Sequence, residues 1–255
     1  MVQSLIFALK QKMATDPIDF PDLPAGSRGL PRLTQQLCQG LACGDCQAAC
    51  PTSAIQLDES DGRCGVSIDL GKCIGCGACI AVCPSGTIES NPSTKTATLT
   101  REALVIRQGE SPSDSRQVVG GSLARSIDIR EISTGCNATD QEVAAITNPV
   151  FDCSRFGIHF VASPRFADAL VVTGPVGRAM QDPLIRTYKS MPEPRIVIAA
   201  GTCAISGGLH AGGYAEANGV LPHVPVNVFV PGCPPHPWSI LHGILLAMGS
   251  TRAHP

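Results

Sequence analysis

A duplicated cysteine pattern constrains the fold of this chain more than any other feature of its sequence. The segments CGDCQAACPTSAI (43–55) and CGACIAVCPSGTI (76–88) share the pattern C-G-x-C-x-A-x-C-P-[ST]-x-x-I. An internal repeat this short can bury only a small core, so packing alone does not account for its cysteines. The repeat therefore indicates a small domain organised around groups that thiols bind.

The chain has 13 cysteines in 255 residues, and its N-terminus lacks the basic region and cleavage site of a signal peptide. We therefore expect reduced, metal-binding cysteines in a cytoplasmic protein rather than disulfides. No apolar run reaches the roughly 18 residues that a membrane-spanning helix needs. With a net charge of −2 and 16% charged residues, the chain offers no basic surface for nucleic acid.

The spacing of the cysteines predicts two [4Fe–4S] clusters. The second run is Cys73-x2-Cys76-x2-Cys79-x3-Cys83-Pro, a spacing in which three thiolates surround one cluster and the fourth reaches a second. The first run has two extra residues after Cys38. Crossed ligation gives Cys38, Cys43, Cys46 and Cys83 for cluster 1, and Cys50, Cys73, Cys76 and Cys79 for cluster 2. Structural zinc is disfavoured, because zinc motifs use isolated cysteine pairs.

Several residues within or near these runs have simpler roles. Gly44, Gly75 and Gly77 are expected to let the backbone approach a cluster and donate N–H bonds to its sulfides. Cys64 is expected on a hairpin strand, and Cys153 has no ligand neighbours in the sequence. Both are expected to pack as small apolar residues.

In the C-terminal half of the sequence, predicted strands alternate with predicted helices. A β-like run at 96–107 and a polar linker at 109–124 precede it. The expected strands are 126–133, 157–163, 168–174, 194–201 and 224–232, and the expected helices are 140–148, 178–190 and 236–249. This order predicts an α/β domain with an open, mostly parallel sheet covered by helices.

Three further cysteines each follow a predicted strand of that sheet. Cys136 follows 126–133, Cys203 follows 194–201 and Cys233 follows 224–232. Because the carboxyl ends of parallel strands meet at one edge, these thiols are expected to converge there. His236 lies near Cys233 and is expected to be a solvated surface residue, although it could donate a hydrogen bond to a cluster.

The segments FVASPRFADALVVTGPV, AAGTCAISGGLHAGGY and VNVFVPGCPPHPWSIL resemble the small subunit of membrane-bound, energy-converting [NiFe] hydrogenases of the hydrogenase-4 and formate hydrogenlyase type. They are also similar to the complex I subunit that carries the terminal cluster. This resemblance covers about residues 125–250 and implies a flavodoxin-like sheet. The front part, through Cys83-Pro, resembles the two-cluster ferredoxin-like α+β subunit of the same complexes, so the chain resembles a fusion of two neighbouring subunits.

The resemblance implies a third iron–sulfur cluster held by Cys136, Cys203 and Cys233. Hydrogenases of this type have C-x-x-C followed by an acid at the first motif, whereas this chain has Thr139 in place of the second cysteine and retains Asp140. Phe166 is a second departure, where related sequences often read P-R-H-A-D. Three outcomes stay open: a [4Fe–4S] cluster completed by Asp140, Thr139 or water, a [3Fe–4S] cluster, or no cluster.

These features divide the chain into four parts. We expect an amphipathic helix, at 2–13, and an irregular docking segment within 1–34. A two-cluster ferredoxin-like domain is expected at 35–108, a linker at 109–124 and the hydrogenase small-subunit-like domain at 125–255. The helix fits either a membrane surface or a partner subunit.

By resemblance, the chain is an iron–sulfur electron-transfer subunit that relays electrons between a soluble donor or acceptor protein and a [NiFe] hydrogenase-type large subunit. The active site is expected on that partner, and membrane-arm subunits would hold the complex on the inner face of the cell membrane. One alternative is a quinone- or sulfur-reducing complex without hydrogen chemistry. Another is a structural or coupling subunit without a functional third cluster.

Overall fold

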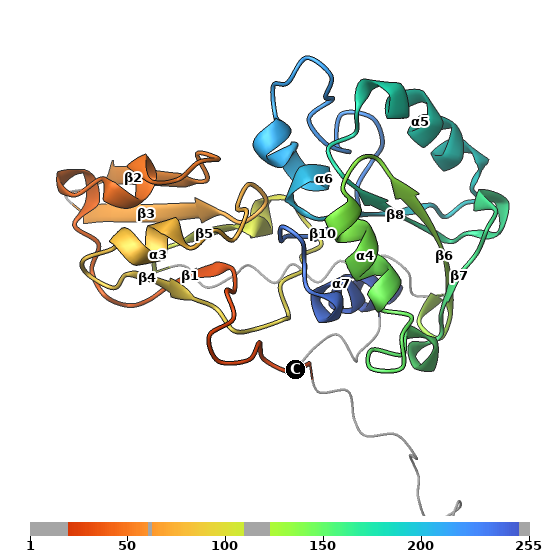
Figure 1. Cartoon of the computed structure of the whole chain (residues 1–255), viewed down its shortest axis with the longest axis horizontal. Coiled ribbons are helices and arrows are strands. Elements are labelled where there is room, and N and C mark those ends of the chain that lie inside the picture. The colour runs from red at the N-terminus through yellow and green to blue at the C-terminus, as the bar shows by residue number, and fades with distance from the viewer. Residues whose placement is uncertain (1–19, 61–62, 110–122, 250–255) are drawn as a thin grey trace, which may run out of the picture.

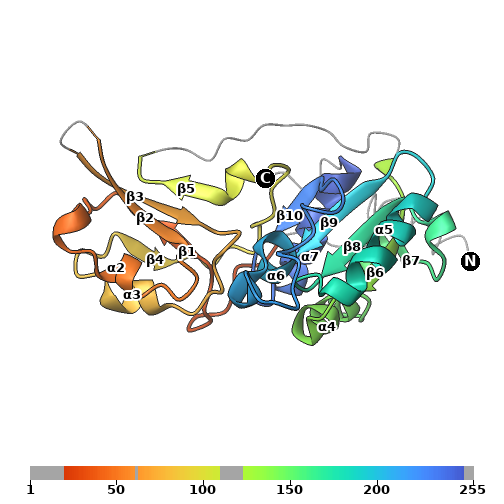
Figure 2. The same cartoon turned by 90° about the horizontal axis from the view of Figure 1, so that it is seen from above.

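The computed structural model describes residues 20–60, 63–109 and 123–249, which form two lobes side by side (Figures 1 and 2). The expected helix at 2–13 and most of the expected linker lie outside the described residues. The N-terminal lobe holds the cysteine repeat, and the C-terminal lobe holds the larger sheet.

The C-terminal lobe is built on a five-stranded sheet in which every pairing is parallel. Its strands are β6 (Ile127–Ser133), β7 (Ile158–Phe160), β8 (Ala169–Thr173), β9 (Ile196–Ala200) and β10 (Val228–Val230), in the order β10-β9-β8-β6-β7. Counted from the first strand, this is the 2-1-3-4-5 order of flavodoxin-like sheets. The predicted α/β class with a flavodoxin-like sheet is confirmed, and the order reverses between β6 and β8.

Helices cover both faces of this sheet. They are α4 (Asn137–Ala145), α5 (Gln181–Ser190), α6 (Thr202–Ser206) and α7 (Pro237–Met248). Along β8, Ala169 and Val171 pack in the core shared with α4 and α7, whereas Leu170 and Val172 pack in the core shared with α5 and α6. Apolar residues on both faces explain why the strands read as continuous hydrophobic runs rather than alternating ones.

The N-terminal lobe contains two small antiparallel sheets and two short helices. One sheet pairs β1 (Pro31–Leu33) with β4 (Ile88–Ser90), and the other has the order β2-β3-β5. The bounds are β2 (Ile55–Ser60), β3 (Arg63–Asp69), β5 (Val105–Arg107), α2 (Asp45–Ala48) and α3 (Ala78–Val82). The strand β1 lies before residue 35, where the ferredoxin-like domain is expected to begin, yet it pairs inside that domain.

The internal repeat is visible in the two short helices. Gly44 precedes α2 with φ 69°, and Gly77 precedes α3 with φ 76°. Each glycine takes the left-handed conformation that side chains disfavour, which explains glycine after the first cysteine of both C-G-x-C units. Short 3₁₀ turns complete the fold: η1 (Gly40–Ala42), η2 (Glu102–Leu104), η4 (Cys153–Phe156), η5 (Pro164–Phe166), η6 (Arg178–Met180) and η7 (Gly208–His210).

The segment before β5 joins the two lobes. Its structure differs from the single β-like run that the sequence predicts. The β-like run expected at 96–107 is interrupted, because Thr98 bridges Phe229 of β10 while only Val105–Arg107 joins β3. The backbone N–H of Ala97 donates to His242 of α7. Earlier in the chain, the Phe20 ring packs edge-on against Trp238 of α7 at 5.7 Å.

Candidate iron–sulfur centres

The first group of thiols surrounds a small cavity in the N-terminal lobe. Cys38, Cys43, Cys46 and Cys83 all line it, so the last cysteine of the second run meets the first three of the other run. The backbone N–H of Gly40 lies 3.3 Å from the Cys38 sulfur, and the Ser85 hydroxyl lies 3.6 Å from the Cys83 sulfur. We refer to this group as site 1.

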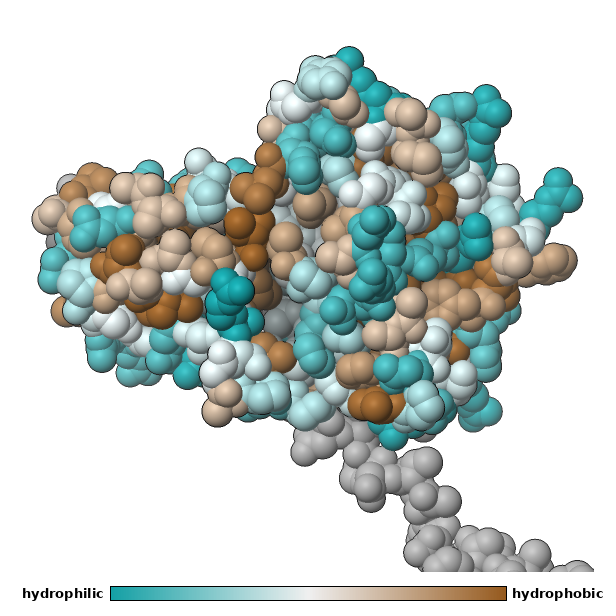
Figure 3. All heavy atoms as spheres, in the orientation of Figure 1, coloured by the Kyte–Doolittle hydropathy of each residue, from teal (hydrophilic) through white to brown (hydrophobic). Residues whose placement is uncertain are grey.

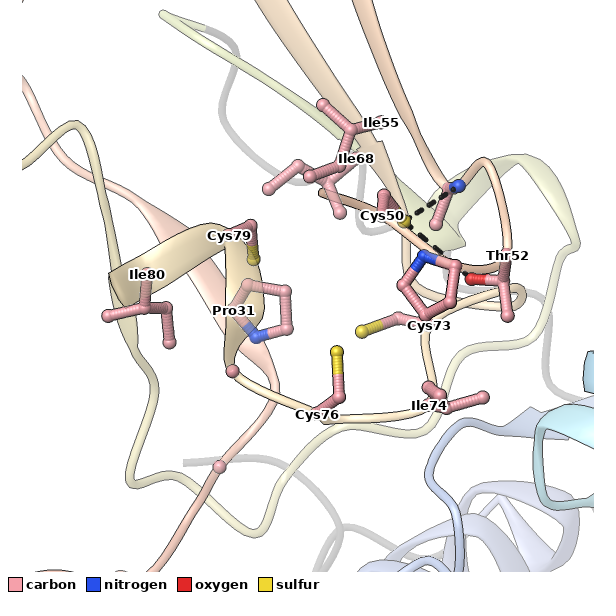
Figure 4. Close-up of a pocket in the computed structure, with 14 residues that line it drawn as sticks. Pro31, Cys50, Thr52, Ile55, Ile68, Cys73, Ile74, Cys76, Cys79 and Ile80 are labelled. Carbon is pink, nitrogen blue, oxygen red and sulfur yellow. Dashed lines mark hydrogen bonds between the residues drawn. The ribbon is translucent and has the colours of Figure 1, made fainter. Parts of the chain in front are cut away.

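The second group, site 2, mirrors this arrangement. Cys50, Cys73, Cys76 and Cys79 line one cavity together with apolar side chains such as Ile55 and Ile68. Figure 4 shows the four thiols turned toward a common space. The Cys50 sulfur accepts from the backbone N–H of Ala54 at 3.2 Å, and the Cys73 sulfur from that of Gly75 at 3.4 Å. The arrangement at both sites matches the ligand sets expected from crossed ligation.

Burial changes how readily several of these thiols ionise. It raises the pKa of Cys73 to about 12 and that of Cys79 to about 11, and neighbouring cysteines add to both shifts. Cys83 differs: burial raises its pKa, but hydrogen bonds from Ile88, Ser85 and Thr87 outweigh this and lower it. Thiolates gathered in an apolar cavity repel one another, so a cationic group between them would stabilise the ionised form.

The spacing of the cysteines fits a cluster better than a single metal ion. Within the described ranges, no three His, Cys, Asp or Glu side chains are arranged to hold one ion. A zinc ion would need its sulfurs within about 2.3 Å of one point. Four inward-facing thiols around an apolar cavity suit a larger group, and the residues at sites 1 and 2 fit a [4Fe–4S] cluster.

The third group, site 3, forms at the carboxyl edge of the parallel sheet. Cys136 caps α4 after β6, Cys203 lies in α6 after β9, and Cys233 follows β10. Burial, together with the nearby sulfurs of Cys233 and Cys136, raises the pKa of Cys203 to about 11. The fold thus brings together three cysteines that lie up to 97 positions apart (233 − 136) in the sequence.

Thr139 and Asp140, the two candidates for a fourth ligand, lie differently around site 3. The Thr139 side chain is 2% exposed, and its hydroxyl lies 3.2 Å from the Cys136 sulfur. Asp140 is engaged elsewhere, since its carboxylate accepts hydrogen bonds from the hydroxyls of Ser133, at 2.6 Å, and Thr173. Of the two candidates, the hydroxyl of Thr139 is therefore the oxygen with a contact to a proposed ligand sulfur, that of Cys136.

The half-buried carboxyl group of Glu131, on β6, lies next to Asp140. Burial, together with the neighbouring Asp140 carboxylate, raises the pKa of Glu131 to about 7. Its Oε1 atom is buried without a hydrogen-bond partner. Glu131 is therefore a carboxyl group with a raised pKa on β6, the strand that leads into site 3, a feature that the sequence alone does not reveal.

The remaining sequence predictions have mixed outcomes. Cys153 is 2% exposed in the main core, as expected of a packed residue. Cys64 lies on β3 of a hairpin, as expected, but its side chain is not described. His236 has a role that the sequence did not predict: this half-buried ring accepts from the backbone N–H of Trp238 at 3.2 Å and caps α7. Phe166 is 72% exposed.

Sequence reasoning missed the residues that dock the lobes next to the cysteines. The Thr202 hydroxyl donates to the carbonyl of Cys73 at 2.7 Å, and the Ser206 hydroxyl donates to that of Gly71 at 2.9 Å. A cavity of about 610 Å³ lies beside these contacts and is lined from both lobes, with Cys76 on one side and Cys233 on the other. The only sequence signal for Thr202 is its position directly before Cys203.

Comparison with known proteins finds matches to two kinds of family model. A model of the family described as NADH ubiquinone oxidoreductase, 20 Kd subunit, matches residues 136–247. Two models of 4Fe-4S dicluster domains match residues 38–87 and 65–137. The iron–sulfur character of the N-terminal lobe predicted from its cysteine spacing is thus confirmed.

Several curated relatives are similar to part of this chain. Formate hydrogenlyase subunit 7 of Escherichia coli is 46% identical over 115 residues, which is 45% of each chain. A probable membrane-bound hydrogenase subunit of Pyrococcus furiosus is 42% identical over 131 residues, or 49% of this chain and 76% of the relative. An NADH-quinone oxidoreductase subunit of Rhizobium etli is 50% identical over 96 residues, or 38% and 57%. The chain thus spans about half the length of some curated relatives and three quarters of another.

Proposed function

This chain belongs to the family of the NADH ubiquinone oxidoreductase 20 Kd subunit, and from that premise we propose that it is an iron–sulfur electron-transfer subunit of a membrane-associated, complex I-related oxidoreductase. Its partner would be a [NiFe] hydrogenase-type large subunit. The observation that carries the proposal is the meeting of two four-thiol sites and a three-thiol site within one docked pair of lobes.

The residues of the chain have defined tasks in this proposal. Site 1 is held by Cys38, Cys43, Cys46 and Cys83, site 2 by Cys50, Cys73, Cys76 and Cys79, and site 3 by Cys136, Cys203 and Cys233. When bound, iron–sulfur clusters accept and release single electrons. The protein fixes their spacing, keeps water away with apolar side chains and donates backbone N–H bonds to the ligand sulfurs.

Thr139 is the better candidate to complete site 3. Its hydroxyl adjoins the Cys136 sulfur, and a side chain on Gly201 would meet it at 3.0 Å, so the hydroxyl lies between the segments of Cys136 and Cys203. Asp140 instead supports the loop through Ser133 and Thr173. Three thiols with one hydroxyl suit either a [4Fe–4S] cluster with an oxygen ligand or a [3Fe–4S] cluster.

Exposed apolar residues support partner docking at the N-terminal lobe. Leu37 is 86% exposed beside Cys38, and Leu41 and Val82 are also exposed. Figure 3 shows apolar side chains gathered on this lobe. Such surfaces commonly mark interaction sites, and we assign this one to a soluble electron donor or acceptor protein.

The complex would hold the chain peripherally on the inner face of the cell membrane, together with membrane-arm subunits. The probable membrane-bound hydrogenase subunit among its relatives supports this placement. Within the described residues, no helix combines the length and apolarity needed to cross a bilayer.

A second candidate function is a related quinone- or sulfur-reducing complex without hydrogen chemistry. The replacement of a thiol by Thr139 favours it, since a changed site 3 suits a changed redox partner. The large subunit encoded beside this chain separates the two candidates. If that subunit lacks the two cysteine pairs that bind nickel, the hydrogenase version of the proposal is wrong.

The central test is Cys203→Ser in the full chain, purified anaerobically with its clusters. We expect loss of the site 3 signal in electron paramagnetic resonance (EPR) spectra and retention of the signals from sites 1 and 2. Cys153→Ser is the matched control, because this buried thiol lies in the apolar core rather than at a site. It should reduce stability by about 1–3 kcal/mol and leave the iron content unchanged.

Iron counting provides the second measurement. About 11 or 12 irons per chain would mean that all three sites are filled, whereas about 8 would mean that site 3 is empty. An unchanged spectrum in Cys203→Ser, or a wild-type chain with only about 8 irons, would favour the structural or coupling role for the C-terminal lobe.

A further inference from the structure

Thr202 lies at the point where the chain segments of sites 2 and 3 meet. It is 1% exposed and directly precedes Cys203. Its backbone N–H donates to the carbonyl of Gly232 at 2.8 Å, which links it to the residue before Cys233. Its hydroxyl donates across the lobe junction to the carbonyl of Cys73 at 2.7 Å. One residue therefore contacts segments of three proposed ligand cysteines.

The hydroxyl of Thr202 has two acceptors within reach but a single proton to donate. The carbonyl of Gly232 lies at 3.1 Å and already accepts the backbone N–H of the same threonine. The carbonyl of Cys73 is closer. Because shorter O–H···O bonds are the better ones, the proton is directed across the junction to Cys73. Cys73 and Cys203 are then joined through covalent bonds and one hydrogen bond.

The loop that carries Cys73 is held by bonds within the N-terminal lobe and by a bond to the C-terminal lobe. The Asp69 carboxylate accepts from the backbone N–H of Gly71 at 2.9 Å and from Arg101 at 2.6 Å. The Arg101 guanidinium lies so close to Gly71 that any side chain there would meet it at 2.8 Å. The Ser206 hydroxyl also donates to the carbonyl of Gly71. The Thr202–Cys73 bond thus forms between two ordered segments.

A second route from site 2 to site 3 passes through open space. Cys76 and Cys233 both line the cavity of about 610 Å³ between the lobes. Electronic coupling decays more slowly through covalent and hydrogen bonds than through open or solvent-filled space. The packed route through Thr202 is therefore the stronger connection.

We propose that Thr202 is a positioning residue for electron transfer, whose hydroxyl bond to the Cys73 carbonyl couples site 2 to site 3. This inference rests on the proposed function. In the step concerned, one electron leaves one site and enters the other, and no covalent bond or proton is transferred. The role belongs to the hydroxyl group, so serine at this position should preserve it and valine, of nearly the same shape, should abolish it.

The test compares four full-length proteins purified anaerobically with their clusters: the wild type, Thr202→Val, Thr202→Ser and Ser206→Ala. A laser flash reduces the protein through a ruthenium photosensitiser, and freeze-quench EPR spectra follow the arrival of the electron at site 3. Ser206→Ala is the matched control, since it also removes a hydroxyl bond across the lobe junction, but that bond goes to the carbonyl of Gly71 and not to the carbonyl of a proposed ligand cysteine. Iron content and melting temperature are measured for each protein.

We expect electron arrival to slow several-fold in Thr202→Val, with iron content unchanged, and to stay near the wild-type rate in Thr202→Ser and Ser206→Ala. If valine disturbs site 3 itself, Thr202→Ala adds no bulk and should show the same slowing. A wild-type rate in both Thr202→Val and Thr202→Ala, or equal slowing in Ser206→Ala, overturns the role of Thr202. Either result leaves the proposed function standing. A wild-type chain without a site 3 signal overturns the proposed function and this inference together.

Discussion

Single residues decide what site 3 can bind, and Thr139 is the most informative of them. It stands where the related hydrogenase pattern has a cysteine, yet its buried hydroxyl keeps the position next to the Cys136 sulfur. Threonine and cysteine are of similar size, so the surrounding packing can accept either. The change is thus in the chemistry of the ligand set, with little change in shape.

We predict that Thr139→Cys makes the iron at site 3 harder to remove, because a thiolate binds iron more strongly than a hydroxyl does. Iron release to a chelator, followed by the loss of the site 3 EPR signal, should be several-fold slower than in the wild type. Thr139→Val keeps the shape without the hydroxyl and should release iron faster. Equal release rates in all three proteins would mean that residue 139 is not a ligand.

At the scale of elements, the strand ends of the C-terminal sheet position the thiols. The sheet order reverses between β6 and β8, and the loop after β6 carries Cys136. Gly174 directly follows β8 with φ 84°, and an added Cβ there would lie 2.7–2.9 Å from backbone atoms of Gly135, Thr134 and Cys136. Close backbone contact between the two strand ends therefore holds the Cys136 loop in place.

We predict that Gly174→Ala displaces this loop and weakens or abolishes the site 3 signal, while sites 1 and 2 remain. Strain and crowding together should cost about 2–4 kcal/mol of folding stability. Gly212→Ala is the matched control, with φ 78° but nothing within 4 Å of the added carbon. It should cost only the conformational strain of about 1–2 kcal/mol and retain site 3. Retention of a normal site 3 in Gly174→Ala would contradict this account of the loop.

At the scale of the whole molecule, the lobes are docked by buried hydrogen bonds as well as by apolar packing. The Ser239 hydroxyl of α7 donates to the carbonyl of Thr94 at 2.7 Å, and the Thr98–Phe229 bridge adds two backbone bonds. The segment 94–98 belongs to the N-terminal lobe by sequence but extends the edge of the C-terminal sheet. Loss of these contacts should affect both lobes.

We predict that Ser239→Ala destabilises the docked molecule by about 1–3 kcal/mol, because it leaves a buried carbonyl without its donor. Circular dichroism and cluster absorbance during anaerobic heating should shift together to lower temperature. Ser190→Ala removes a similar hydroxyl-to-carbonyl bond at the exposed end of α5 and should shift neither. Separate transitions for the two probes would show that the lobes unfold independently.

Local sequence was sufficient for the features that depend on spacing or periodicity. The two closely spaced cysteine runs predicted iron–sulfur character, and the alternation of apolar runs predicted the α/β sheet, because both are local patterns with one favoured geometry. The three cysteines after strand ends were expected to converge, since parallel strands end at one edge. The short helix α6 and the role of His236 as a helix cap were missed, because brief elements give little periodic signal.

Only the tertiary structure decided how the parts meet. Nothing local predicts that Thr202 donates to Cys73, that Asp140 is engaged by Ser133 and Thr173, or that residues 94–98 cross to the other lobe. These contacts join segments far apart in sequence, and each is selected by the packing of two lobes rather than by any one segment's own preference. Sequence by itself therefore determined which thiols this protein offers, and the fold decided how they are connected.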